Sequence, residues 1–206
     1  MIGFYNYTVI LTYISLLSSM AGIFFACSGH PFAAIVCLMV SGLCDMFDGK
    51  VARTRKRTEE EKSFGIQIDS LCDVVCFGVL PAVIGFSLRA DAYFLWPVWA
   101  LYPLCAVIRL GYFNVTEEAR QHRTDEVRKT YLGLPVTSSA IILPLVFLLH
   151  RRIDWFPALY ACVLVLIALC FLCPFHLRKP HKKGVLLLLG AGLVEFALLL
   201  LFHVFG

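Results

Sequence analysis

Seven apolar segments alternate with short polar or charged intervals along the chain. They cover residues of about 4–26, 31–53, 64–88, 92–113, 132–149, 155–175 and 185–205. Each is close to the ~20 residues that an α-helix needs to cross a bilayer. The pattern predicts an all-α, polytopic membrane helix bundle with about seven transmembrane helices. Because no internal repeat or low-complexity linker interrupts it, we expect one domain over residues 1–206.

The composition supports the same class of protein. Of the 206 residues, 60% are hydrophobic, and the mean hydropathy is +0.81. These values exclude an ordinary soluble domain of this length. We therefore expect the lipid bilayer as the surroundings of the chain and no nucleic-acid partner.

Lys and Arg residues gather in alternate intervals, which predicts the orientation. Three intervals carry most of them: Arg53, Arg55, Lys56, Arg57 and Lys62; Arg120, Arg123, Arg128 and Lys129; Arg178, Lys179, Lys182 and Lys183. The intervals expected on the other side hold only Arg89, Arg151 and Arg152. Because positive loops stay in the cytoplasm, the N-terminus is predicted to be cytoplasmic, in the cell membrane, with the C-terminus outside.

Four aspartates lie at helical spacing beside apolar residues. Asp45 and Asp48 are i,i+3 neighbours, and Asp69 and Asp73 are i,i+4 neighbours, so each pair occupies one helix face. An uncompensated carboxylate near a membrane interior costs several kcal/mol. Two hard divalent cations would neutralise the set, because all-oxygen ligands suit Mg²⁺ or Mn²⁺, and a carboxylate-bridged pair can clamp a phosphate. The alternative is that each aspartate caps a helix or reaches the interface.

The aspartates belong to a longer motif, D-x-x-D-G-x-x-A-R followed by G-x-x-x-D-x-x-x-D. It resembles the signature of the CDP-alcohol phosphotransferases and matches every fixed position. The interval from Arg53 to Gly65 has eleven residues where the signature has eight, which we expect to lengthen a solvent-facing loop. The resemblance implies a six-helix core, here with an extra C-terminal span, two Mg²⁺ or Mn²⁺ ions, and a homodimer.

The resemblance also implies a reaction on the cytoplasmic side. An alcohol hydroxyl attacks the lipid-side phosphorus of a CDP-linked lipid, and CMP leaves. Asp45, Asp48 and Asp69 would then be metal ligands. Asp73 matches the position proposed both as a ligand of the second metal and as the general base, so Asp69 and Asp73 are the expected catalytic residues.

Five further residues are expected to bind the nucleotide and the lipid phosphates. Gly49 and Ala52 lack bulk on the aspartate face, although small residues also serve helix packing in membranes. Arg53 would bind phosphate with its planar guanidinium group, or act as a positive-inside anchor. Gly65 is a fixed position of the motif. Asn6, in Y-N-Y-T, is similar to a family segment that lies near the nucleotide.

Stretches outside the signature are similar to the phosphatidylserine synthase branch of this family. They are I-D-S-L-C-D-V-V-C-F-G at 68–78, I-R-L-G-Y-F-N at 108–114 and G-L-P at 133–135. This similarity implies CDP-diacylglycerol and L-serine as substrates.

A serine site needs a cation for the substrate carboxylate, and Arg109 is the candidate because it lies within an apolar segment. An ion pair of Arg109 with an aspartate or with a lipid phosphate is the alternative. Asn114, Lys129 and Thr130 would complete the pocket.

Other functions are left open by the sequence. The same chemistry could use glycerol phosphate or an inositol phosphate as the acceptor, or an archaeal ether lipid as the donor. Intramembrane aspartates also line ion-coupled transporters, but a cation path would not require the glycine, alanine and arginine of the motif.

Overall fold

The computed structural model describes residues 3, 7–52, 54–55, 58–121, 130–178 and 182–205. Its main helices are α1 (Ile10–Cys27), α2 (Pro31–Ala52), α3 (Glu59–Asp73), α4 (Leu80–Leu88), α5 (Trp96–Gln121), α6 (Ser139–Phe147), α7 (Phe156–Leu172) and α8 (Lys182–Phe205). The shorter elements are 3-10 turns at Tyr7–Val9, Tyr93–Leu95 and Val136–Ser138, a π-helical segment at Val74–Val79, and the strands β1 (Thr130–Leu132) and β2 (His176–Arg178).

The predicted helical membrane bundle is confirmed. Within the described residues, five helical stretches are long and apolar enough to cross a membrane: 10–27, 31–52, 59–88, 93–118 and 184–202. Shorter apolar helices at 136–147 and 156–172 occupy the fifth and sixth predicted segments. The number of crossings and the side on which the N-terminus lies stay predictions.

The third span begins earlier than hydropathy indicates, because a polar cap starts the helix. The Glu61 backbone N–H donates to the Thr58 hydroxyl over 3.2 Å, and the Thr58 N–H donates to the Glu61 carboxylate over 3.1 Å. Such a reciprocal cap satisfies two N–H groups at the helix start. Residues 59–64, which the sequence places in a lengthened loop, are therefore the first turns of α3, and that expectation was wrong for this part of the interval.

Residues 59–88 form one continuous span in which α3 passes through the π-helical segment Val74–Val79 into α4. The segment begins directly after Asp73. A π-helical turn inside an α-helix is uncommon and often accompanies a functional site.

α5 also continues beyond its apolar part. Residues 114–121 were expected in a polar loop, but they extend the helix to Gln121, because hydropathy marks where a helix leaves the bilayer and not where it ends.

One feature departs from an all-α fold: β1 and β2 pair antiparallel, with Tyr131 opposite Leu177.

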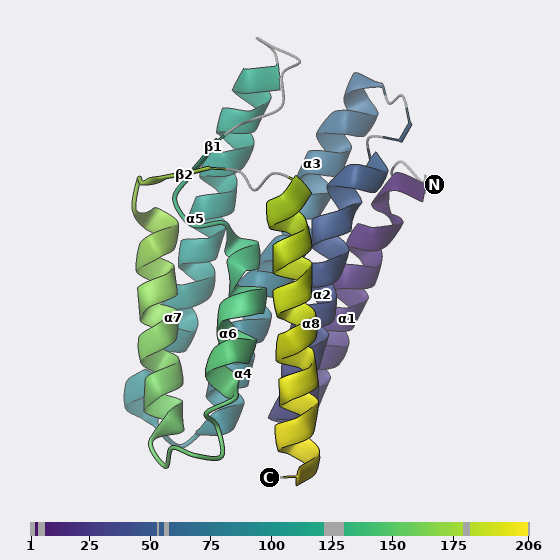
Figure 1. The fold of residues 1–206 in the computed structure, drawn as a ribbon. Helices are drawn as coiled ribbons and strands as arrows, with labels where there is room; N and C mark the ends of the chain where they lie inside the picture. The colour runs from purple at the N-terminus through teal and green to yellow at the C-terminus, as the bar shows by residue number, and fades with distance from the viewer. Residues whose placement is uncertain are drawn as a thin grey trace.

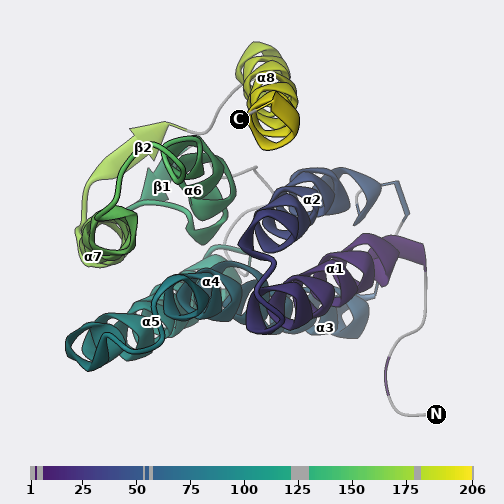
Figure 2. The same ribbon diagram turned by 90° about the horizontal axis from the view of Figure 1, so that it is seen from below.

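The helices run side by side along the long axis of the molecule (Figure 1). Seen along that axis, α1 to α5 form one group, α6 and α7 lie beside it, and α8 lies at the periphery (Figure 2). α8 contacts α6 and α2, while Leu186, Leu187 and Leu193 on its surface are exposed. The last helix is thus the least buried of the long apolar stretches.

Small and hydroxyl side chains bring α1 and α2 close together. The Ser41 hydroxyl donates to the Ser15 carbonyl over 3.0 Å and lies 2.8 Å from the Ser19 hydroxyl. A Cβ at Gly22 would lie 2.9 Å from the Cβ of Cys37. Close packing of this kind is a usual means of helix association in membranes, and it fixes α2, whose last turns carry the first aspartate pair.

Candidate metal and substrate site

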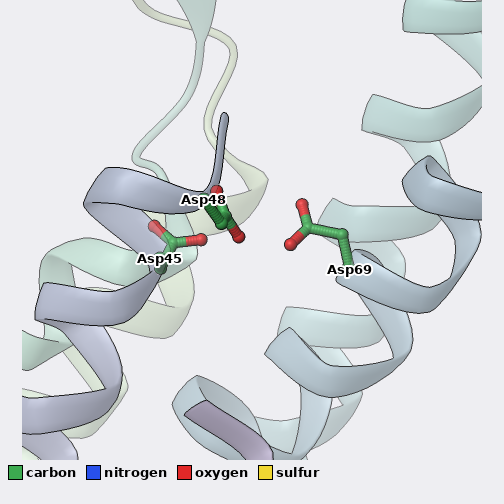
Figure 3. A group of neighbouring side chains, drawn as sticks. All are labelled: Asp45, Asp48 and Asp69. Atoms are coloured by element: carbon green, nitrogen blue, oxygen red, sulfur yellow. The ribbon is translucent and has the colours of Figure 1, made fainter. Parts of the chain in front are cut away.

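Three of the four predicted aspartates converge between α2 and α3. One carboxylate oxygen from each of Asp45, Asp48 and Asp69 lies within 4.8 Å of the other two. Figure 3 shows Asp45 and Asp48 on one helix and Asp69 facing them from another. All three side chains are half-buried. The i,i+3 spacing on α2 places Asp45 and Asp48 on the face that meets α3.

This group has a high negative charge density. Among the described residues, no Lys or Arg forms an ion pair with any of the three carboxylates. At an effective dielectric constant of about 20, two unit charges 4 Å apart repel by about 4 kcal/mol. The ionised group therefore requires a cation for stability.

The donor set fits a hard divalent cation. It consists of carboxylate oxygens from two rigid helices, without a thiolate or imidazole among the three, and this chemistry suits Mg²⁺ or Mn²⁺. The residues at the predicted metal position therefore fit such a cation. How many ions bind there stays a prediction.

Asp73 lies outside this group of three. Its side chain is 8% exposed, at the end of α3, and it interacts electrostatically with Asp45 and Asp69. Four residues advance a helix by about 6 Å, so Asp73 is one turn deeper in the bundle than Asp69. Three of the four aspartates expected in one metal site thus lie close together, and the role of all four as metal ligands stays a prediction.

The small motif residues lie next to the aspartates. Gly49 is exposed in α2, and a Cβ built on it would meet nothing within 4 Å, so its backbone faces open space. Ala52 is the last residue of α2, and Gly65 is half-buried one turn before Asp69 in α3. Arg53 and Asn6 lie outside the described residues.

The N-terminal segment passes close to the end of α2. The Tyr7 hydroxyl lies 3.0 Å from the Thr54 hydroxyl, and the Thr54 hydroxyl donates to the Val51 carbonyl over 2.7 Å. These contacts bring the residues that flank Asn6 and Arg53 in sequence to the same region of the molecule.

Two of the predicted acceptor residues belong to α5. Arg109 is 6% exposed, and its Nε donates to the Leu134 carbonyl over 3.2 Å. The Asn114 Oδ1 accepts a 2.7 Å hydrogen bond from the Ser70 hydroxyl. Ser70 directly follows Asp69, so Asn114 is connected to the aspartate site. Ser70 was not predicted as a site residue, because no spacing in the sequence indicates it.

The other acceptor candidates fall where the chain is only partly described. Lys129 lies outside the described residues, and Thr130 begins β1. After β1, Gly133 has a φ of +74°, and a Cβ there would lie 3.0 Å from the Cys173 carbonyl oxygen. The Gly133 N–H donates to the Phe175 carbonyl over 2.7 Å. Glycine is thus required where the chain turns toward Leu134 and Arg109.

Comparison with known proteins agrees with the motif. A sequence model of the family described as CDP-alcohol phosphatidyltransferase matches residues 5–174. The chain is 33% identical to a CDP-diacylglycerol--serine O-phosphatidyltransferase of Mycobacterium leprae over 133 residues, which are 64% of this chain and 43% of that protein. It is 28% identical to the protein of that name in Helicobacter pylori over 188 residues, 88% of this chain and 74% of the relative.

An archaeal protein is also similar. The chain is 29% identical to an archaetidylserine synthase of Methanothermobacter thermautotrophicus over 176 residues, 84% of this chain and 70% of that protein. By contrast, the chain spans less than half the length of the mycobacterial relatives that it matches.

Proposed function

Because the chain belongs to the CDP-alcohol phosphatidyltransferase family, we propose that it transfers the phosphatidyl group of CDP-diacylglycerol to the hydroxyl of L-serine. The products are phosphatidylserine and CMP. The observation that carries this proposal is the convergence of Asp45, Asp48 and Asp69 from two helices. The similarity to bacterial proteins named CDP-diacylglycerol--serine O-phosphatidyltransferase supports serine as the acceptor.

Resemblance to the family implies two divalent cations. Their ligands would be Asp45, Asp48 and Asp69, and Asp73 would be a further ligand of the second cation. Bound there, Mg²⁺ or Mn²⁺ supplies positive charge to the pyrophosphate oxygens and to the phosphate that leaves. The aspartates themselves contribute a rigid arrangement, since each is carried by a helix and not by a loop.

Asp73 is proposed as the general base. It accepts the proton of the serine hydroxyl, whose oxygen forms a bond to the lipid-side phosphorus. The bond from this phosphorus to the CMP oxygen breaks, and CMP leaves. Burial at the end of α3 keeps Asp73 away from bulk water, which favours proton transfer from the substrate over exchange with solvent.

The donor is proposed to bind beside α2. Gly49 and Ala52 leave room for the cytidine or its ribose against the helix backbone, and the open space at Gly49 supports this position. Gly65 plays the same part on α3. Arg53 and Asn6 are proposed to contact the phosphates and the nucleotide.

Serine is proposed to bind between α5 and the segment that follows β1. Arg109 pairs with the substrate carboxylate, and Asn114, Lys129 and Thr130 contribute polar contacts. The hydrogen bond from Ser70 to Asn114 supports a pocket adjacent to the aspartates. The protein is proposed to lie in the cell membrane with this site facing the cytoplasm, from which serine arrives. It is also proposed to form a homodimer.

One observation supports an alternative lipid donor. The archaeal relative is named for the archaetidyl group, so an ether lipid linked to CDP is the alternative to the diacyl donor. The aspartate site would act on either, because both donors carry the same pyrophosphate.

The test is CMP release by the full chain, purified in detergent, with CDP-diacylglycerol or its ether counterpart and Mg²⁺ or Mn²⁺. L-serine, glycerol phosphate and an inositol phosphate are compared as acceptors. We expect release with serine and loss of release on chelation. Release only with a phosphorylated acceptor would overturn the serine assignment. Ion flux into liposomes that contain the chain, without CMP release, would favour a transporter.

A further inference from the structure

A second candidate site lies at the opposite end of the bundle. A cavity of about 740 Å³, partly open at the surface, is lined by the turn between α1 and α2, the connection between α6 and α7, and the end of α8. Its lining includes Ala33, in the first turn of α2, whereas Asp45 lies twelve residues further along the same helix. At 1.5 Å per residue this is a separation of about 18 Å, so the cavity is distinct from the aspartate site.

The lining of the cavity is cationic. Its positive charge comes from Arg151 and Arg152, beside His30 and His150, and no carboxylate is among the described residues that line it. The N-terminus of α2 also opens into it, beginning at Pro31 with no acidic residue in the first turn. The first N–H groups of a helix and its dipole favour an anion at this position. Charge and helix orientation therefore both favour a negatively charged ligand.

The two arginines are held against the end of α8. The Arg151 Nη1 donates to the Phe202 carbonyl over 3.5 Å, and the Arg152 guanidinium lies 5.1 Å from the centre of the Phe202 ring. These contacts use few of the five N–H donors that each guanidinium offers. In addition, the His150 Nδ1 is buried without a hydrogen-bond partner among the described residues.

The rest of the lining is largely apolar, and exposed aromatic residues lie at the same end of the bundle. Phe25, Leu199 and Phe202 contribute apolar surface. At the same end, Trp155 is 62% exposed and Tyr93 is 71% exposed, and exposed aromatic residues of this kind mark the interface of a bilayer. The anion available at this depth, beside apolar surface, is the phosphate of a phospholipid.

We propose that an anionic phospholipid binds in this cavity, in the leaflet opposite the aspartate site. Arg151 and Arg152 contact its headgroup phosphate, and one acyl chain packs against Leu199 and Phe202. Basic pockets between membrane helices recognise lipid headgroups in this way. The lipid joins α8, which lies at the edge of the bundle (Figure 2), to the start of α2 and to the connection that follows α6. This proposal does not depend on the proposed reaction.

The test is the thermal unfolding midpoint of the full chain in a neutral detergent, with dioleoyl phosphatidylglycerol, dioleoyl phosphatidylcholine or inorganic phosphate added. We expect phosphatidylglycerol to raise the midpoint by roughly 5–10 °C, as a ligand near 100 times its Kd would. Phosphatidylcholine and inorganic phosphate should raise it by less than half as much. An equal rise with either one would overturn an anionic phospholipid as the ligand.

The Arg151→Gln/Arg152→Gln variant is expected to lose most of the rise with phosphatidylglycerol. Arg89→Gln is the matched control, because Arg89 is an exposed arginine between α4 and α5, at the same end of the bundle, and should keep the full rise. If the double variant does not fold, each single variant should lose part of the rise. An unchanged rise in the folded double variant, or in both single variants, would contradict the proposal.

Discussion

The Ser70 hydroxyl donates a 2.7 Å hydrogen bond to the Oδ1 of Asn114 and so connects α3, beside Asp69, to α5. Both residues are close to the proposed acceptor pocket, but only Asn114 is expected to touch serine. Removal of either side chain breaks this hydrogen bond, which is worth about 1 kcal/mol. The pair therefore separates a positioning role from a binding role.

Asn114→Ala is expected to raise the KM for serine several-fold more than Ser70→Ala does. Both variants should lower the unfolding midpoint by a similar amount, because they lose the same hydrogen bond. The measurement is the initial rate of CMP release as a function of serine concentration. Equal KM values in the two variants would show that Asn114 only positions α3.

Gly49 offers a test of donor binding. Gly49→Ala should leave the fold intact and stabilise α2 by about 0.5–1 kcal/mol, because alanine favours the helix and its Cβ meets no neighbour. We expect the KM for CDP-diacylglycerol to rise about tenfold, a loss of about 1.4 kcal/mol in binding. Gly190→Ala in α8, where a Cβ also meets no neighbour, is the matched control and should leave that KM unchanged. A wild-type KM for Gly49→Ala would remove Gly49 from the donor site.

Because of His150, we expect the stability of the folded protein to depend on pH. Its ring stacks on Phe147 at 4.7 Å between centroids, and burial, together with Arg151, lowers the pKa of His150 from 6.5. The unfolded chain then binds a proton more readily than the folded chain, so stability falls as the pH drops below 6.5. Among the cavity-lining residues, the other charged or titratable groups are His30, Arg151 and Arg152.

The measurement is the unfolding midpoint at pH 8 and pH 5 in detergent without added phospholipid. His150→Phe keeps the aromatic packing and removes the titrating group, so its midpoint should fall less between these pH values than that of the wild type. The same fall in both proteins would assign the acid sensitivity to other groups.

The helical spans were predictable because they rest on hydropathy, and the aspartate pairs because they rest on helical spacing. The level at which two helices pack against each other has no such signal. Asp69 and Asp73 share a face of α3, yet only Asp69 has a carboxylate oxygen within 4.8 Å of those of Asp45 and Asp48. Hydropathy alone therefore cannot show how close the four aspartates lie to one another.

Some of the missed features had a readable cause. Thr58 and Glu61 have the spacing of a capping box, which would have moved the start of α3 into the charged interval. The pairing of β1 with β2 joins segments 46 residues apart between Tyr131 and Leu177, and the three-residue strands carry too little periodicity to predict it. The cavity at the far end depends on two connections and the end of α8 meeting in space, which no local pattern encodes.

The measurement that tests the account most directly is metal-dependent CMP release by Asp69→Asn. The change keeps the size of the side chain and removes one negative charge from the group of three. We expect release to fall by at least about 100-fold, as for the loss of a principal electrostatic contact, while the protein remains folded in detergent. Asp91→Asn, at an exposed aspartate between α4 and α5, is the control and should retain wild-type release. Full activity of Asp69→Asn would contradict a catalytic metal site at Asp45, Asp48 and Asp69.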